Sequence, residues 1–292
     1  MRTVSTLDGI ESKLVRRVNF ESDFMQGQPK LAITDFADQR RVMWSSIAQT
    51  HSVDEMGVRR LLNSLDALLA ALPPGDPNRR FVLHEQAYLY AYLMKVDPAI
   101  KLFMQAELEG LSPIAKSVSA AHALYVCGEI HMAVKEVELV NLEKADSADL
   151  IAVANQCVHL GLFRRARDLY EKAGASVEGY VGRVKCAAEL MEGIDASDHE
   201  VSDRLAVAAR IVREMSCHPL IGYDVFAMHD EGILFRFVVR DDIERLVEID
   251  MEIDSVLSST FDSSIDELFS IGICPHTAGS LKEIGDAYNV SV

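Results

Sequence analysis

Three alanines set a period in the middle of this chain. Ala99, Ala133 and Ala166 lie 34 and 33 residues apart, and each sits in the same pattern of a helix, a turn and a second helix. A hairpin of two helices cannot bury its apolar face alone, so repeated hairpins must stack on their neighbours. The sequence therefore predicts antiparallel helical-hairpin repeats with a long concave surface, of the kind that holds other proteins.

The clearest copy of this pattern spans residues 147–180, and more degenerate copies cover about 80–111 and 114–146. Over roughly residues 80–180 the chain resembles the tetratricopeptide-repeat proteins. An irregular helical bundle that shows the period by chance is the alternative. The small and large apolar residues that carry the resemblance in the clearest copy are Val153, Ala154, Cys157, Leu160, Gly161, Phe163, Ala166, Tyr170 and Ala173.

The resemblance implies which side chains line the concave groove. Those positions hold tyrosines, histidines and an asparagine with few charges, a composition that suits a partner peptide. Packing of the same side chains against a neighbouring helix is the plainer alternative. The candidate partner-binding residues are His84, Tyr88, Tyr92, His122, Tyr125, Asn155 and His159.

Two changes of pattern divide the chain into regions. The segment 73–77, Pro-Pro-Gly-Asp-Pro, ends an N-terminal helical region, residues 1–78, which continues or caps the repeats of residues 79–217. In that first region, amphipathic stripes predict helices near 7–18, 31–47 and 54–72. Because contacts between repeats are local, we expect residues 1–217 to fold without the remainder.

Residues 218–292 predict a small acidic α+β domain. Segments 223–228 and 233–239 are rich in β-branched and aromatic residues and flank a turn, which indicates a β-hairpin. Segment 241–259 alternates like a strand over part of its length, but its length favours a helix. A third strand near 268–274 and a short helix near 280–288 complete a β-β-α-β order, so the expected fold class is mostly α followed by α+β.

Charge is concentrated at the C-terminal end. The formal net charge is −16, and residues 222–292 hold 4 basic against 15 acidic side chains. Because affinity for nucleic acid depends on neutralised phosphates, we expect no direct nucleic-acid partner. An acidic module is drawn to a basic protein surface, although a solvated face that only keeps the protein in solution is the alternative. The candidate acidic docking face consists of Glu248, Asp250, Glu252 and Asp254.

Arginine pairs recur in the chain and offer a basic counterpart. If the pairs of the first half share a face, they could receive an acidic partner or the acidic domain of another copy, so a homo-oligomer is possible. Solvation on separate faces is the alternative. The pairs are Arg16-Arg17, Arg40-Arg41, Arg59-Arg60, Arg79-Arg80 and Arg164-Arg165.

The cysteines and the absence of known motifs limit which compartments, cofactors and activities the sequence predicts. Five scattered cysteines fit reduced thiols in a cytoplasmic protein, and no run of apolar residues is long enough to span a membrane. No cofactor motif is present, so neither a cofactor nor catalytic residues are predicted, and an enzyme remains a less favoured reading. The zinc-competent residues lack the tight pairs of a zinc site and predict no metal: Cys217, His218, His229, Cys274 and His276.

Three functions follow as expectations. The first is a non-catalytic cytoplasmic adaptor or regulator that grips a partner protein in the concave groove. The second is an acidic inhibitor whose C-terminal domain docks on a basic, nucleic-acid-binding protein surface. The third is an unrecognised enzyme with a helical targeting arm.

Overall fold

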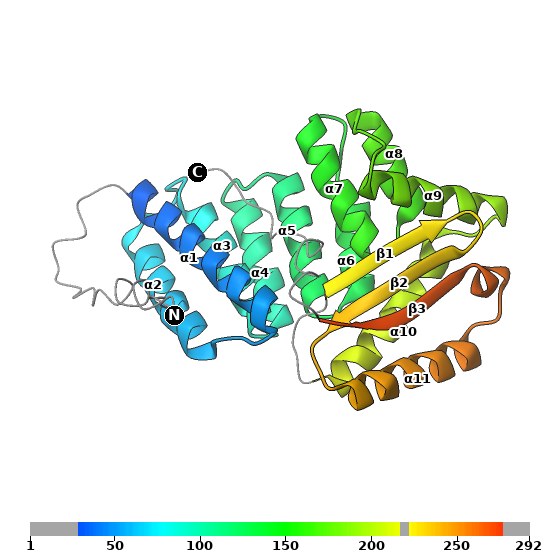
Figure 1. Ribbon diagram of the computed structural model, residues 1–292. Coiled ribbons are helices and arrows are strands. Elements are labelled where there is room, and N and C mark those ends of the chain that lie inside the picture. The colour runs from blue at the N-terminus through cyan, green and yellow to red at the C-terminus, as the bar shows by residue number, and fades with distance from the viewer. Residues whose placement is uncertain (1–28, 217–221, 277–292) are drawn as a thin grey trace, which may run out of the picture.

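A computed structural model describes residues 29–216 and 222–276. The first part of this described chain is helical, and successive helices lie side by side (Figure 1). The fold class is as predicted: mostly α, with helical hairpins followed by an α+β part. The helices are α1 (Pro29–Thr50), α2 (Glu55–Ala71), α3 (Arg79–Tyr92), α4 (Val96–Leu108), α5 (Pro113–Val126), α6 (Ile130–Glu138), α7 (Ser147–His159), α8 (Phe163–Ala173), α9 (Tyr180–Gly193) and α10 (Asp198–Met215).

Three hairpins, α3/α4, α5/α6 and α7/α8, form the repeated unit. Each reverses direction through a residue in the left-handed region, at Met94, Gly128 and Gly161 with φ of 58°, 80° and 73°. At Gly161 an added Cβ would lie 2.5 Å from Val201 Cγ1 and 2.7 Å from Leu205 Cδ1. Glycine is therefore needed there for its backbone angle and for the close approach of α10.

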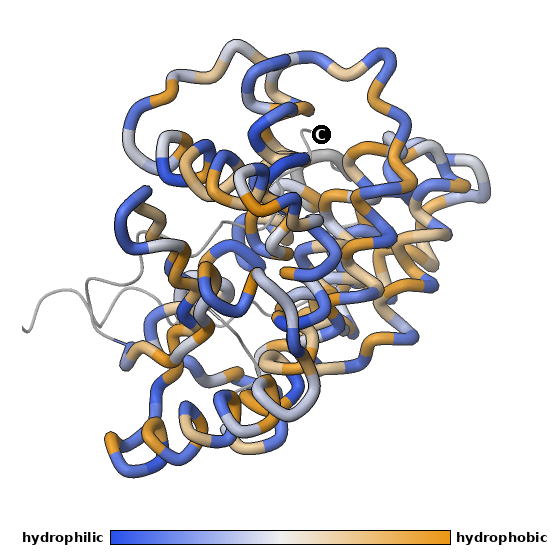
Figure 2. The backbone as a smooth tube through the Cα atoms, turned by 90° about the vertical axis from the view of Figure 1, so that its right-hand side faces the viewer, coloured by the Kyte–Doolittle hydropathy of each residue, from blue (hydrophilic) through white to orange (hydrophobic). Residues whose placement is uncertain are grey.

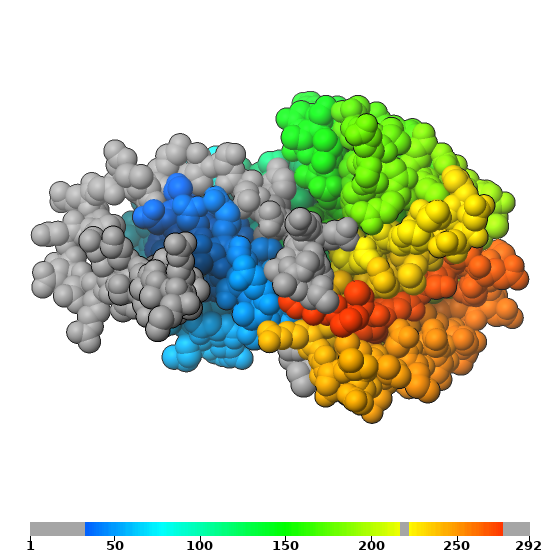
Figure 3. Space-filling view, in the orientation of Figure 1, coloured from blue at the N-terminus to red at the C-terminus, as the bar shows by residue number. Residues whose placement is uncertain are grey.

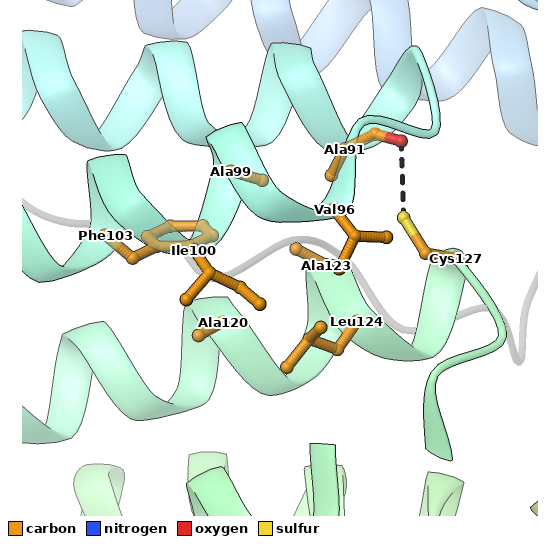
Figure 4. A pocket seen from close by; sticks show the side chains of 9 residues that line it. All are labelled: Ala91, Val96, Ala99, Ile100, Phe103, Ala120, Ala123, Leu124 and Cys127. Atoms are coloured by element: carbon orange, nitrogen blue, oxygen red, sulfur yellow. Dashed lines mark hydrogen bonds between the residues drawn. The ribbon is translucent and has the colours of Figure 1, made fainter. Parts of the chain in front are cut away.

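The repeated alanines lie at helix contacts, as the period predicts. Ala99, Ala133 and Ala166 are no more than 3% exposed. The seam between the first and second hairpins, drawn in Figure 4, has no room for a water molecule, and the Cys127 thiol donates to the Ala91 carbonyl at 3.5 Å. Its lining is Ala91, Val96, Ala99, Ile100, Phe103, Ala120, Ala123, Leu124 and Cys127.

The second part is a three-stranded sheet with one long helix. Strands β1 (Gly222–Met228) and β2 (Gly232–Val239) pair antiparallel, and β3 (Phe269–Pro275) runs parallel to β2 after the crossover helix α11 (Ile243–Thr260) and a 3₁₀ turn. The predicted β-β-α-β order is confirmed within the described residues. The expected helices near 7–18 and 280–288 lie outside them.

Segment 241–259 is a helix, as its length indicated. Asp242 caps its start by accepting a hydrogen bond from the Arg245 amide, and Leu246, Ile249 and Ile253 are buried on one side. Burial at intervals of three and four residues is helical spacing, so the alternating acidic residues do not indicate a strand.

Among the described residues, the sheet shares its hydrophobic core with the helices. One hydrophobic cluster extends from α5 through α10 into the strands and α11. Polar contacts cross the same boundary: the Tyr180 and Tyr223 hydroxyls lie 2.6 Å apart, and Arg204 on α10 donates to Asp266 at 2.6 Å. The change from helix to strand lies near the predicted division at 217/218, but the core continues across it.

Along the coloured part of the chain, hydrophobic residues recur in short stretches between hydrophilic ones (Figure 2). Within residues 29–216 and 222–276, no helix is long and apolar enough to cross a membrane.

Candidate partner-binding face

The predicted groove residues lie on the inner helices α3, α5 and α7, but the face that they form is covered. Six of the seven are no more than 3% exposed. Asn155 alone is exposed, and it accepts a 2.6 Å hydrogen bond from the Tyr170 hydroxyl. Ring contacts connect the helices, with centroids 6.0 Å apart for Tyr88 and His122 and 6.4 Å for His122 and His159. We call this set the concave face, after the concave surface that the repeat pattern predicts: His84, Tyr88, Tyr92, His122, Tyr125, Asn155 and His159.

Helix α1 covers the first half of the concave face. The Trp44 ring stacks on Tyr92 at 5.6 Å between centroids and meets the edge of His122 at 5.0 Å. The buried residues of α1 recur every three or four positions, which places them on one side of the helix. They are Ile33, Ala37, Arg40, Trp44 and Ile47.

A buried hydrogen-bond network fastens α1 to α3. Arg40 donates from Nε and Nη2 to the two carboxylate oxygens of Glu85, and its guanidinium lies 4.5 Å from the centre of the Tyr88 ring. His84 Nδ1 lies 3.1 Å from Glu85 Oε1, and His84 Nε2 lies 2.9 Å from the Ser119 hydroxyl on α5. Because a carboxylate only accepts, Nδ1 carries the proton and Nε2 accepts from Ser119.

The network contains two opposite charges, the Arg40 guanidinium and the Glu85 carboxylate. Burial by itself would raise the pKa of Glu85, but the Arg40 charge and the His84 hydrogen bond outweigh it and bring that pKa down to about 2. Burial also disfavours the guanidinium, yet Glu85 beside it keeps the pKa of Arg40 above its ordinary value. Burial lowers the pKa of His84 despite the adjacent carboxylate, so the imidazole is neutral. The network holds one cation and one anion at neutral pH.

The hydroxyl, imidazole and carboxylate of Ser119, His84 and Glu85 stand in the order used by hydrolytic triads. All three side chains are at most 5% exposed, and Arg40 occupies the far side of the carboxylate. In this arrangement the group connects α1, α3 and α5, and it has no room for a substrate.

The sheet covers the second half of the concave face. Tyr223 of β1 meets His159 at 4.5 Å and Tyr125 at 6.0 Å between ring centroids. Burial, with a smaller effect of His122, lowers the pKa of His159 to about 3. Figure 3 shows α1 in blue and the strands in yellow to red on the same side of the molecule.

The two covers meet where α1 ends. Arg240, directly after β2, donates to the Thr50 carbonyl at 2.6 Å. The rings of His51 and His276 have centroids 4.1 Å apart, so the residue that follows α1 contacts the residue that follows β3. Within the described residues, the inner face is therefore occupied from both ends by the chain itself.

The predicted acidic docking face on α11 is only partly a free surface. Asp250 is half-buried and accepts the backbone N–H of Ile273, in the edge strand β3, at 2.9 Å. This hydrogen bond joins α11 to the edge of the sheet. Glu248 is exposed and paired with Arg245 at 2.7 Å, while Glu252 and Asp254 are exposed.

Beside these acids α11 carries an apolar row that the sequence reading missed. Ile243, Val247 and Met251 are 73%, 51% and 68% exposed and lie four residues apart, so they share one side of the helix. Glu244 adds to the acidic row next to them. The outer surface of α11 is amphipathic.

The zinc-competent residues do not form a ligand set in the part of the chain that the structure describes. No group of three or more His, Cys, Asp or Glu side chains there could hold a metal ion. His229 instead lies 3.5 Å from Glu189, and Cys217 and His218 lie outside the described residues. The buried thiols of Cys127 and Cys157 have pKa values raised by burial to about 12, so neither is reactive near neutral pH.

The sequence reading also missed α1 as the cover of the concave face. The sequence placed both members of Arg40-Arg41 at the surface, either facing an acidic partner or solvated on separate faces. In the structure Arg40 is 1% exposed, while Arg41 is at the surface and paired with Asp38. The signal was present: apolar residues at 33, 37, 44 and 47 with a cation at 40 are spaced as one helix face.

Comparison with known proteins gave no match to a family model, to a curated protein or to a solved structure.

Proposed function

We propose that the chain is a protein-interaction module of the tetratricopeptide-repeat kind, whose concave face binds a helical segment of a partner protein. In this proposal α1 occupies the face until the partner replaces it. The chain then acts as a regulator or adaptor that has a closed form, with α1 docked, and an open form. Support comes from the repeated hairpins and from the aromatic and polar composition of their inner side chains.

One observation carries this proposal: α1 lies on the concave face in the way a bound peptide helix does. Its contacts are made by side chains from one helix face, with Arg40 and Trp44 as anchors four residues apart. Helix-in-groove recognition uses this pattern of anchors at i and i+4. In this proposal α1 leaves while the hairpins stay folded, and residues 51–54 keep it connected to α2.

The covalent connection makes α1 a strong competitor. Tethered segments have effective concentrations of about millimolar, so a partner must bind the open form well to shift the population. A variant with a weakened α1 should therefore bind the partner better than the natural chain does.

The test is capture of partners from the native host by four forms of the full chain, followed by mass spectrometry and reconstitution with the purified partner. Trp44→Ala removes an α1 anchor, Glu85→Gln alters the inner face, and the third variant combines them. We expect recovery to rise with Trp44→Ala and to fall when Glu85→Gln is added. A partner recovered equally by all four forms contradicts the proposal.

A second function is favoured by the surface of α11. The exposed row of Ile243, Val247 and Met251 beside Glu244 and Glu252 suits a basic amphipathic surface on another protein. Under this alternative, the same capture experiment gives a partner that is lost when Glu244 and Glu252 are changed to Gln and is unaffected by Trp44→Ala. Binding should also weaken steeply with salt.

A further inference from the structure

We infer that the concave face selects partner helices that carry an arginine and, four residues later, a large aromatic side chain. This inference rests on the proposed function, because it names the kind of helix that can replace α1. The contacts of Arg40 and Trp44 define the two requirements.

The first requirement comes from Glu85. This carboxylate is 5% exposed and is held by Arg40 on one side and His84 on the other. A helix with an apolar residue at the Arg40 position would bury the carboxylate with only a neutral imidazole beside it. Leaving a buried charge without its partner is strongly unfavourable. Any helix that takes the place of α1 must therefore bring a cation to this point.

The geometry favours arginine over lysine. The Arg40 guanidinium bonds both oxygens of Glu85 and also lies over the Tyr88 ring at 4.5 Å. A planar guanidinium can make both contacts together, whereas an ammonium group is a compact point charge without the fork geometry. Lysine should satisfy the charge and lose the second hydrogen bond and the stacking.

The second requirement comes from the site between α3 and α5. Trp44 stacks on Tyr92 and meets His122, with 6% of its surface exposed. One helical turn separates Arg40 from Trp44, so both point to the same side of α1. Ala37, one turn before Arg40, is buried as well, so α1 carries a small side chain at that position of the docked face.

The selected pattern is therefore small-x-x-Arg-x-x-x-aromatic on one helix. The arginine matches the buried charge of Glu85, and the aromatic ring stacks on Tyr92.

The experiment uses the full chain with a protease site inserted after Ser52, cut after folding, so that α1 is held only by non-covalent contacts. A fluorescein-labelled peptide with the sequence of residues 29–52 is then added, and exchange is followed by fluorescence anisotropy. Peptides with Arg40→Gln, Arg40→Lys, Trp44→Ala and the matched control Arg41→Gln are compared. Arg41 is adjacent but exposed, so it tests net charge alone.

We expect Arg40→Gln and Trp44→Ala to weaken binding by about 30-fold or more, since loss of a buried charge partner or of an aromatic anchor has effects of this size. Arg40→Lys should fall between Arg40→Gln and the natural peptide, and Arg41→Gln should stay within about twofold. When the cut chain carries Glu85→Gln, the natural peptide should bind less than about threefold more tightly than the Arg40→Gln peptide.

Two negative results of the exchange experiment would have different meanings. If the natural peptide exchanges but Arg40→Gln binds equally well, the arginine requirement is wrong while the proposed function stands. If the fragment cannot be exchanged by any peptide while the cut chain remains folded, the concave face is closed to helices, and both the inference and the proposed function are wrong.

Discussion

The Arg40–Glu85 pair is a buried ion pair between residues 45 positions apart. Such pairs contribute little net stability compared with apolar residues of similar volume, but the loss of one member leaves an uncompensated charge. We expect the pair to act mainly on specificity, because a shifted register of α1 would leave Glu85 buried without Arg40.

Arg40→Ala should loosen the docking of α1. We expect its docking free energy to fall by about 3–5 kcal/mol, because Glu85 then stays buried without a counter-charge. Native-state hydrogen exchange of the α1 amides measures this change. Arg41→Ala is the control and should change it by no more than about 0.5 kcal/mol, since the Arg41 pair with Asp38 is exposed. Equal protection of α1 in both variants contradicts the role of the buried pair.

His159 makes stability depend on pH. Its folded pKa is about 3, below the ordinary 6.5, because it is buried. Between these values the unfolded chain binds a proton that the folded chain does not, so the free energy of unfolding falls as pH is lowered through this range. The slope from this residue is at most about 1.4 kcal/mol per pH unit. The lowered pKa of His84 acts in the same direction.

Urea unfolding between about pH 6.5 and 4.5 checks this dependence. His159→Gln should flatten the curve relative to the natural chain, because it removes the buried imidazole. Identical slopes for the natural chain and His159→Gln would show that the buried imidazole is not the source.

Residue types on the inner face could be predicted from the sequence, but their burial could not. The repeat pattern places Tyr88 and His122 correctly on inner helices, because that position follows from local helical spacing. Whether another part of the chain covers them depends on a contact between α1 and α3. The helical spacing of Arg40 with its apolar neighbours marks the buried guanidinium, but it does not show which surface that helix face packs against.

At the scale of elements, the positions of the hairpins and strands could be predicted from short-range patterns in the sequence. The alanine period locates close helix contacts, and Asp242 with Leu246, Ile249 and Ile253 defines α11. The parallel register of β3 on β2 was not predictable, because it depends on how α11 packs against the sheet.

Gly161→Ala and Gly174→Ala form a matched pair that tests the packing of α10 on the third hairpin. Both glycines have φ near 70°, but an added Cβ meets nothing within 4 Å at Gly174 and meets Val201 and Leu205 at Gly161. The backbone angle should make each substitution cost about 1–2 kcal/mol. Crowding should add about 1–3 kcal/mol at Gly161 only. Equal losses in urea unfolding would mean that α10 does not pack over this turn.

At the scale of the whole molecule, the hydrophobic cluster unites the later helices with the sheet. This changes the expectation that residues 1–217 fold alone, because removal of the strands would expose the rings of Tyr125 and His159. We expect a chain truncated after Ser216 to lose cooperative melting by circular dichroism. A truncated chain that melts as sharply as the full one would restore the earlier expectation.

The central claim is that α1 is a separable cover of the concave face, and Trp44 reports on it directly. Trp44 is the single tryptophan of the chain and is 6% exposed against Tyr92 and His122. The measurement is Trp44 emission and iodide quenching against urea, compared with helical circular dichroism of the same samples. The account predicts that Trp44 is buried without urea and becomes exposed at a lower urea concentration than the one at which helix is lost. Arg40→Ala should lower the urea midpoint of Trp44 exposure further, and Arg41→Ala should not. A Trp44 that is quenched without urea, or that becomes exposed only with the loss of helix in all three chains, would contradict the claim.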